Sequence, residues 1–176
     1  MKKRILTATV FICLILVGLS ACGDKAGQEE VFDLSRLQTE DGAYQYKDIP
    51  FGSSYEEVAK KIPLKLEEMT SESGSAWSFY YSVEPIAFYG EEGKFSLEFT
   101  DDKLETVKAS AELSGGEEQF EELAGKMVEW YGEAEVNVSE TATIYSWEKN
   151  GGHINAILFE DSGKYYGIFG VFYMEE

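Results

Sequence analysis

Two stretches of the chain have the apolar spacing of an amphipathic helix, at positions i, i+3, i+4 and i+7. The first stripe is Tyr55, Val58, Ala59 and Ile62, and the second is Phe120, Leu123, Ala124, Met127 and Tyr131. A serine at position 53 or 54 can cap the first helix, and Pro63 interrupts it. Gly132 is the expected stop of the second. The pattern therefore predicts two helices, each with one buried side.

After each predicted helix, apolar and polar residues alternate with a period of two, which is typical of antiparallel strands with one buried face. The predicted strands are residues 77–83, 95–99, 107–113, 143–148, 153–160 and 165–174, and the last of them does not alternate. The turns expected between them are Asp101-Asp102-Lys103, Asn150-Gly151-Gly152 and Asp161-Ser162-Gly163-Lys164. The Asn-Gly pair is a strong hairpin signal.

The two halves share an internal repeat, because residues 54–62 align with residues 119–127. An aromatic residue, two glutamates, an aliphatic residue, an alanine, a lysine and a second aliphatic residue recur in the same order. Duplicated units of this length bury their apolar faces together. We therefore expect an α+β fold of two tandem repeats, residues 44–115 and 116–176. Each repeat has a helix followed by three or four antiparallel strands, and the helices pack on one face of the sheet.

The last predicted strand, residues 165–174, is apolar at both parities, although a strand with one wet face should alternate. Either it is a central strand covered on both faces, or it exposes an apolar patch. An exposed patch would be a recognition surface, because aromatic residues dominate contact energies at interfaces. Parity does not say which set points outward. The candidate contact residues are Tyr80, Tyr145, Trp147, Tyr166 and Phe172.

The N-terminus has another pattern. Lys2, Lys3 and Arg4 precede an apolar run of about 15 residues, and small residues then lead to Cys22. This order resembles the signal peptide and lipobox of bacterial lipoproteins. The resemblance implies that residues 1–21 are removed and that a diacylglycerol is attached to the Cys22 sulfur, which holds a protein stably on a bilayer. An uncleaved membrane helix is the alternative, but the run is shorter than the roughly 20 residues that spanning needs.

The lipobox resemblance also implies a location, on the extracytoplasmic side of the cell membrane, or on the outer membrane if the cell has one. Residues 22–43 are polar and acidic, and we interpret them as the lipidated N-terminus and a flexible tether, with one helical turn at residues 31–37.

Residues 44–58 resemble a second group. Their run through Pro50-Phe51-Gly52 into Ser54-Tyr55-Glu56-Glu57-Val58 resembles the strand, glycine turn and helix that open exported lipoproteins of the beta-lactamase-inhibitor-protein-like fold. The small lipoprotein of the outer-membrane barrel-assembly machinery opens similarly. The resemblance implies two tandem helix-plus-sheet repeats whose sheet presents aromatic residues to a protein partner. The inhibitor has disulfides and the mature chain here has none, and no inhibitory loop carries over.

The composition limits the partners. The chain has 33 acidic and 15 basic residues, for a formal net charge of −18. Three basic residues precede Cys22, so the mature chain has a formal charge of −21. This charge disfavours nucleic acid and contact with an anionic membrane surface, and it favours either plain solubility or attraction to a cationic partner or divalent cations. Cys13 lies in the removed segment and Cys22 is lipidated, so we expect no disulfide.

The residues that carry catalysis are scarce. His153 is the only histidine, which excludes Cys-His pairs and histidine-rich zinc sites from the mature chain. No calcium loop, nucleotide-binding glycine motif or nucleophile elbow is present. We therefore predict no catalytic residue, cofactor or metal, and a lipid-anchored extracytoplasmic binding or accessory protein. The alternatives are an envelope enzyme that uses a carboxylate pair or His153, and a purely structural envelope lipoprotein.

Overall fold

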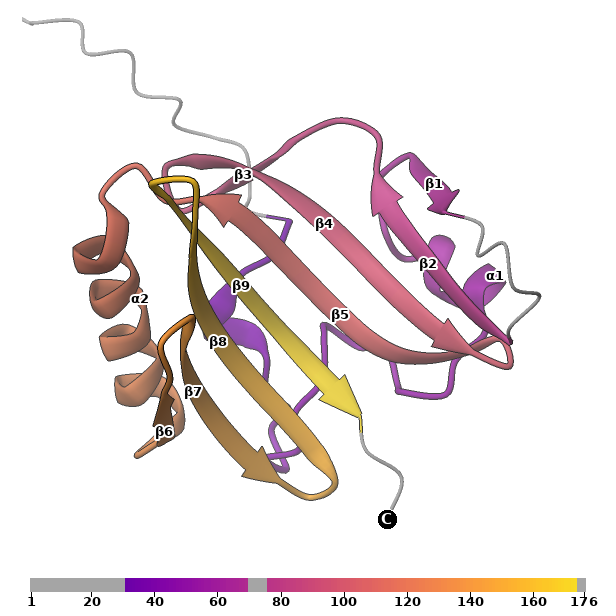
Figure 1. The fold of residues 1–176 in the computed structure, drawn as a ribbon. Coiled ribbons are helices and arrows are strands. Elements are labelled where there is room, and N and C mark those ends of the chain that lie inside the picture. Colours follow the sequence, from indigo (N-terminus) through magenta and orange to yellow (C-terminus); the bar gives the residue numbers. More distant parts are fainter. Residues whose placement is uncertain (1–30, 70–75, 174–176) are drawn as a thin grey trace, which may run out of the picture.

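The computed structural model describes residues 31–69 and 76–173, which form one antiparallel sheet of nine strands and two α-helices (Figure 1). This is the predicted α+β class. In chain order the elements are η1 (Leu34–Arg36, a 3-10 turn), α1 (Tyr55–Ala59), β1 (Leu66–Met69), β2 (Trp77–Ser82), β3 (Ile86–Phe88), β4 (Glu91–Thr100), β5 (Lys103–Glu112), α2 (Gly116–Tyr131), β6 (Glu135–Val138), β7 (Ala142–Lys149), β8 (Gly152–Asp161) and β9 (Lys164–Tyr173).

The strands follow the order β1-β2-β4-β5-β9-β8-β7-β6, and β3 pairs with the start of β4. Two-residue turns with positive φ at both central residues close four hairpins, at residues 89–90, 101–102, 150–151 and 162–163. Such turns match the twist of the strands that they join. The three turns expected from the sequence are confirmed. The sequence pattern missed β1, β3 and β6, which have only three or four residues each and therefore little alternation.

The two helices differ in how closely they follow the prediction. α2 buries the expected stripe from Phe120 to Met127 and ends before Gly132, whose φ is 90°. α1 has a capping box between Ser54 and Glu57 but ends at Ala59, one turn earlier than the stripe suggested. The later stripe residue Ile62 is nevertheless buried. Because the residue before a proline avoids the helical region, Pro63 stops the helix before Ile62.

Both helices cover the same face of the sheet. In α1, Tyr55 stacks on Tyr80 of β2 with ring centroids 4.0 Å apart, and in α2, Phe120 packs on Phe169 of β9 at 5.8 Å. The register from β2 through β4 and β5 to β9 places Tyr80 and Phe169 on the same side. We call this side the covered face and the other side the open face. Figure 1 views the open face, with α1 and the N-terminal segment behind the strands.

The N-terminal segment, residues 31–43, is part of this packing, which corrects the tether assignment for these residues. Phe32, Leu34 and Leu37 are completely buried. The ring of Phe32 stacks on Tyr46 at 5.5 Å and packs against Phe95 of β4 at 6.2 Å. Apolar side chains with this burial hold the segment against the covered face, so any tether lies before residue 31. The expected helical turn is present as η1.

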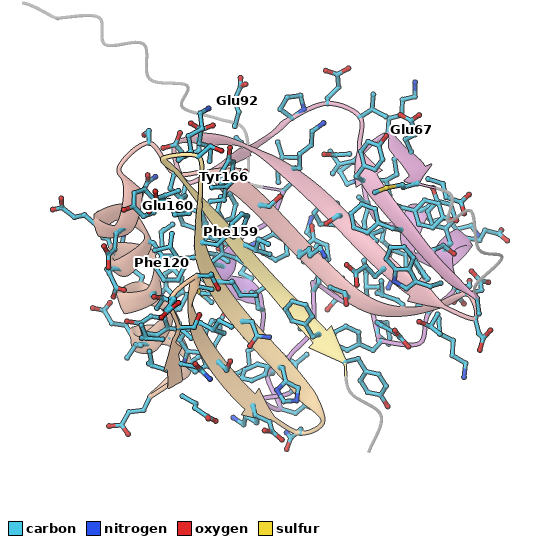
Figure 2. The ribbon with its side chains drawn as sticks, in the orientation of Figure 1. Glu67, Glu92, Phe120, Phe159, Glu160 and Tyr166 are labelled. Atoms are coloured by element: carbon cyan, nitrogen blue, oxygen red, sulfur yellow. The ribbon has the colours of Figure 1, made fainter. Side chains whose placement is uncertain are left out.

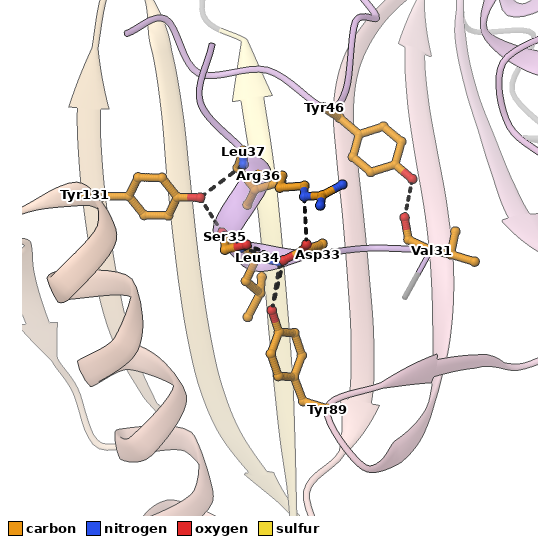
Figure 3. Close-up of polar contacts among 9 residues, drawn as sticks. All are labelled: Val31, Asp33, Leu34, Ser35, Arg36, Leu37, Tyr46, Tyr89 and Tyr131. Carbon is orange, nitrogen blue, oxygen red and sulfur yellow. Dashed lines mark hydrogen bonds and ion pairs between the residues drawn. The ribbon is translucent and has the colours of Figure 1, made fainter. Parts of the chain in front are cut away.

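Tyrosine hydroxyls from distant parts of the chain fix the backbone of this segment (Figure 3). The Leu37 N–H donates to the Tyr131 oxygen at 3.0 Å, and the Tyr131 hydroxyl in turn donates to the Leu34 carbonyl. Tyr46 donates to the Val31 carbonyl. Burial raises the pKa of Tyr131 to about 12 and that of Tyr46 further still, so both hydroxyls keep the proton that they donate.

We expect Phe32→Ala to lower the free energy of unfolding by about 3–5 kcal/mol, because it leaves a cavity among aromatic rings that lose their contacts. Urea denaturation would measure the change. The matched control is Arg36→Ala in the same segment, whose side chain is 72% exposed and should cost less than about 1 kcal/mol. Equal stability of the Phe32 variant and the parent would contradict the packing of residues 31–43.

Candidate binding face

The open face carries an apolar area over β7, β8 and β9. Ile144, Ile157 and Ile168 lie in register across the three strands. In the neighbouring row, the rings of Phe159 and Tyr166 stack at 5.3 Å with an angle of 19° between their planes (Figure 2). We call the set the β7–β9 patch; its members, all half-buried, are Ile144, Ile157, Phe159, Tyr166, Ile168 and Phe172. No described helix packs over this patch, because both helices lie on the covered face.

Small and polar residues form the row between Ile168 and Phe172. Gly170 lets the Phe172 ring lie close to the backbone, since a Cβ at this position would lie only 3.0 Å from the ring. Asn155 is the cross-strand neighbour of Gly170 on β8. Its Oδ1 atom is buried and has no hydrogen-bond partner among the described residues. Native structures leave few such acceptors without water or another donor.

A second aromatic group lies at the other end of the open face. Trp77, Phe79 and Tyr81 project from β2 in a ladder, with successive ring centroids 5.9 and 6.3 Å apart. Trp77 is 39% exposed. Two lysines already occupy the ladder, because the Nζ atom of Lys108 lies 5.4 Å from the Phe79 centroid and that of Lys94 lies 5.8 Å from the Tyr81 centroid. These cation–π contacts satisfy ring faces that a partner would otherwise use.

A polar stripe on β4 and β5 separates the β2 ladder from the β7–β9 patch. Cross-strand register places Lys94, Ser96, Glu98, Thr106, Lys108 and Ser110 in this stripe. Lys108 forms an ion pair with Glu98, so the stripe satisfies part of its own charge. The stripe has the polar character normal for the wet face of an antiparallel sheet, and the β7–β9 patch departs from it.

The structure separates the five candidate contact residues by face. Tyr166 and Phe172 lie in the β7–β9 patch. Tyr80, Tyr145 and Trp147 lie on the covered face, where they pack against the core. This corrects their assignment as surface contact residues. Tyr80 stacks against α1, and Trp147 is only 3% exposed, with its Nε1–H donating to the Gly132 carbonyl at 2.9 Å.

Tyr145 is held on the covered face by α2. Its hydroxyl donates to the Glu121 carboxylate at 2.8 Å, and this hydrogen bond raises the pKa of Tyr145. The sequence reasoning missed four patch residues, Ile144, Ile157, Phe159 and Ile168. Their signal was present, because each has the parity opposite to the covered residues of its own strand. Three of the four are isoleucines, whereas the expected contact residues were all aromatic, and parity alone did not assign Phe159 to either face.

A hollow of about 560 Å³ lies where the short strand β6 leaves the end of β7 unpaired. Ile144 of the patch lines it, together with His153 and the carboxylates of Glu133, Glu135 and Glu148. We call it the edge hollow. His153 faces Glu148 across the β7–β8 ladder, but within the described residues its imidazole forms no hydrogen bond or ion pair with a carboxylate.

The described residues contain neither a candidate metal cluster nor a candidate membrane-spanning helix. No group of three or more His, Cys, Asp or Glu side chains in residues 31–69 and 76–173 is placed to hold a metal ion. None of the helices in these ranges has the length and hydropathy to cross a membrane. Cys22 and the predicted signal peptide lie outside the described residues.

Comparison with known proteins adds no relative. No protein-family model, curated protein or solved structure matches the chain. The candidate face is therefore judged on its own geometry.

Two isoleucines of β8 test which face is open. Ile154 is completely buried on the covered face, whereas Ile157 is half-buried in the β7–β9 patch. We expect Ile154→Ser to lower the free energy of unfolding by about 4 kcal/mol and Ile157→Ser by only about 1 kcal/mol. The reason is that folding removes less apolar area from contact with water at position 157 than at position 154. Denaturant titration would compare them. A larger loss for the Ile157 variant would show that its side is the packed one.

Proposed function

We propose that this protein is a lipid-anchored binding module that recognises a protein or envelope component through the β7–β9 patch. The observation that carries the proposal is the row of aliphatic and aromatic side chains on a sheet face that no described helix covers. Single apolar residues on a surface need no explanation, but a contiguous group across three strands is typical of an interaction site. Phe159, Tyr166 and Phe172 supply the large rigid rings that carry contact energy at interfaces.

The topology supports the duplicated organisation inferred from the sequence. The strand order is symmetric about the β5–β9 pair, with β4, β2 and β1 on one side and β8, β7 and β6 on the other. Each helix precedes the strands of its own half. We propose that the two halves are tandem repeats and that β3 is an addition to the first. The proposal agrees with the resemblance of residues 44–58 to beta-lactamase-inhibitor-protein-like lipoproteins, whose sheet contacts a protein.

The anchor is proposed from the lipobox alone. Residues 31–43 pack on the covered face, so a chain anchored at Cys22 has at most residues 22–30 between the lipid and the folded domain. This short connection would keep the domain near the bilayer. The excess of acidic residues would hold its surface off anionic headgroups.

We expect Cys22→Ala to abolish incorporation of a radiolabelled fatty acid and to move the protein out of the membrane fraction. The matched control is Cys13→Ala, which removes the only other cysteine and should leave labelling unchanged. Labelling that persists in the Cys22 variant would contradict the anchor. The measurement is autoradiography of the immunoprecipitated protein after growth with labelled palmitate.

Site-specific photocrosslinking in intact cells would test the face. A photoreactive amino acid at position 157 of the patch should give a discrete adduct, whereas the same amino acid at position 122, on the exposed side of α2, should not. The reason is that position 157 lies within the contiguous apolar patch, whereas position 122 is an exposed glutamate position on α2. Adducts from position 122 alone, or from neither position, would contradict binding through the open face.

A further inference from the structure

The edge hollow adds a chemical requirement to the binding face, and the inference drawn from it depends on the proposed function. The hollow and the β7–β9 patch are continuous, because Ile144 belongs to both. Ser146 and Glu148 continue the open-face side of β7 from Ile144 into the hollow. A partner that covers the isoleucine row therefore also reaches the hollow.

The charges in the hollow are unbalanced. Glu133, Glu135 and Glu148 are exposed, and none of the three forms an ion pair or a side-chain hydrogen bond within the described part of the chain. Lys149 is the lysine in its wall, and His153 is the histidine. Two other carboxylates of this face do have partners: Glu98 pairs with Lys108, and Glu112 pairs with Lys164 at 2.8 Å. Glu67 and Glu92 resemble the carboxylates of the hollow in having no partner among the described residues, but neither lines the hollow.

We propose that the occupant of the β7–β9 patch is a segment of a partner protein that combines apolar side chains with lysine or arginine. Its apolar groups cover the isoleucine row, and its cationic groups enter the edge hollow beside Glu135 and Glu148. Complementary charge next to an apolar contact fixes the register of a complex and speeds association. The hollow thus selects a basic partner over a neutral one.

The charge of the chain argues against the other occupants. A second copy would bring two molecules of formal charge −18 together through the same acidic edge. An anionic lipid surface would meet the same repulsion. A basic polypeptide gains from both features of the face, its apolar row and its unpaired carboxylates.

Fluorescence anisotropy with defined peptides would test the proposal on the full chain in nonionic detergent. The probe is a short labelled peptide in which lysine or arginine alternates with isoleucine and tyrosine. One comparison peptide has glutamate at the basic positions, and another has serine at the apolar positions. We expect the first peptide to bind and both comparison peptides to bind at least about tenfold more weakly.

Two pairs of substitutions, each removing two negative charges, then locate the contact. Glu135→Gln with Glu148→Gln should raise the dissociation constant of the basic peptide about tenfold. Glu67→Gln with Glu68→Gln should change it less than about twofold, because both lie on β1, at the other end of the strand order from β7, and Glu67 lies far from Phe159 and Tyr166 in Figure 2. The loss in the first pair should shrink as salt is added.

Several results would overturn the proposal. An equal loss in both pairs of variants would show only general attraction to an acidic protein. Binding that is lost in Ile157→Ser but unchanged in Glu135→Gln with Glu148→Gln would remove the basic requirement and leave the proposed function in place. No binding of the basic peptide at millimolar concentration would overturn it as well. A dimer that Ile157→Ser dissociates, measured by sedimentation, would assign the patch to a second copy.

Discussion

The packing of every helix and of the N-terminal segment on one side of the sheet is the constraint on which the rest of the structure depends. Phe32, Phe95 and Phe169 are fully buried in the core formed there. Tyrosine hydroxyls that bind the backbone of residues 31–37 hold the outer layer in place. Because α1, α2 and residues 31–43 all pack on this side, no described helix covers the other side of the nine strands. Packing in the core therefore does not account for the apolar side chains on that side.

The open face carries different kinds of side chain over its two halves. Over β4 and β5 it carries lysine, glutamate, serine and threonine, and two of the lysines lie over the rings of the β2 ladder. Over β7, β8 and β9 it carries isoleucine and aromatic side chains. Exposed apolar area costs free energy in proportion to its size, about 25 cal/mol for each Å². The β7–β9 patch therefore gains free energy when a partner covers it, and the unpaired carboxylates beside it favour a partner of positive charge.

Much of the local structure could be predicted. The stripe from Phe120 to Tyr131 became α2, and Asn150-Gly151 became a hairpin turn, because spacing and positive φ depend on neighbouring residues only. The anomaly of residues 165–174, apolar at both parities, also marked the strand that lies at the centre of the sheet. The tether boundary was wrong because Phe32, Leu34 and Leu37 stand in a polar stretch, and their burial depends on Tyr46, Tyr89 and Tyr131 far along the chain.

By itself, the sequence determined the α+β class, the long strands, the turns and the acidic charge, since each of these follows from composition or short-range spacing. Only the tertiary structure decided which parity of each strand meets the helices. Trp147 and Ile157 looked equally available in a strand pattern, yet one is buried beneath Gly132 and the other lies in the β7–β9 patch. Alternation divides the residues of a strand between two faces but does not show which face is buried. A face becomes part of the core only when distant segments, here α1, α2 and residues 31–43, pack against it.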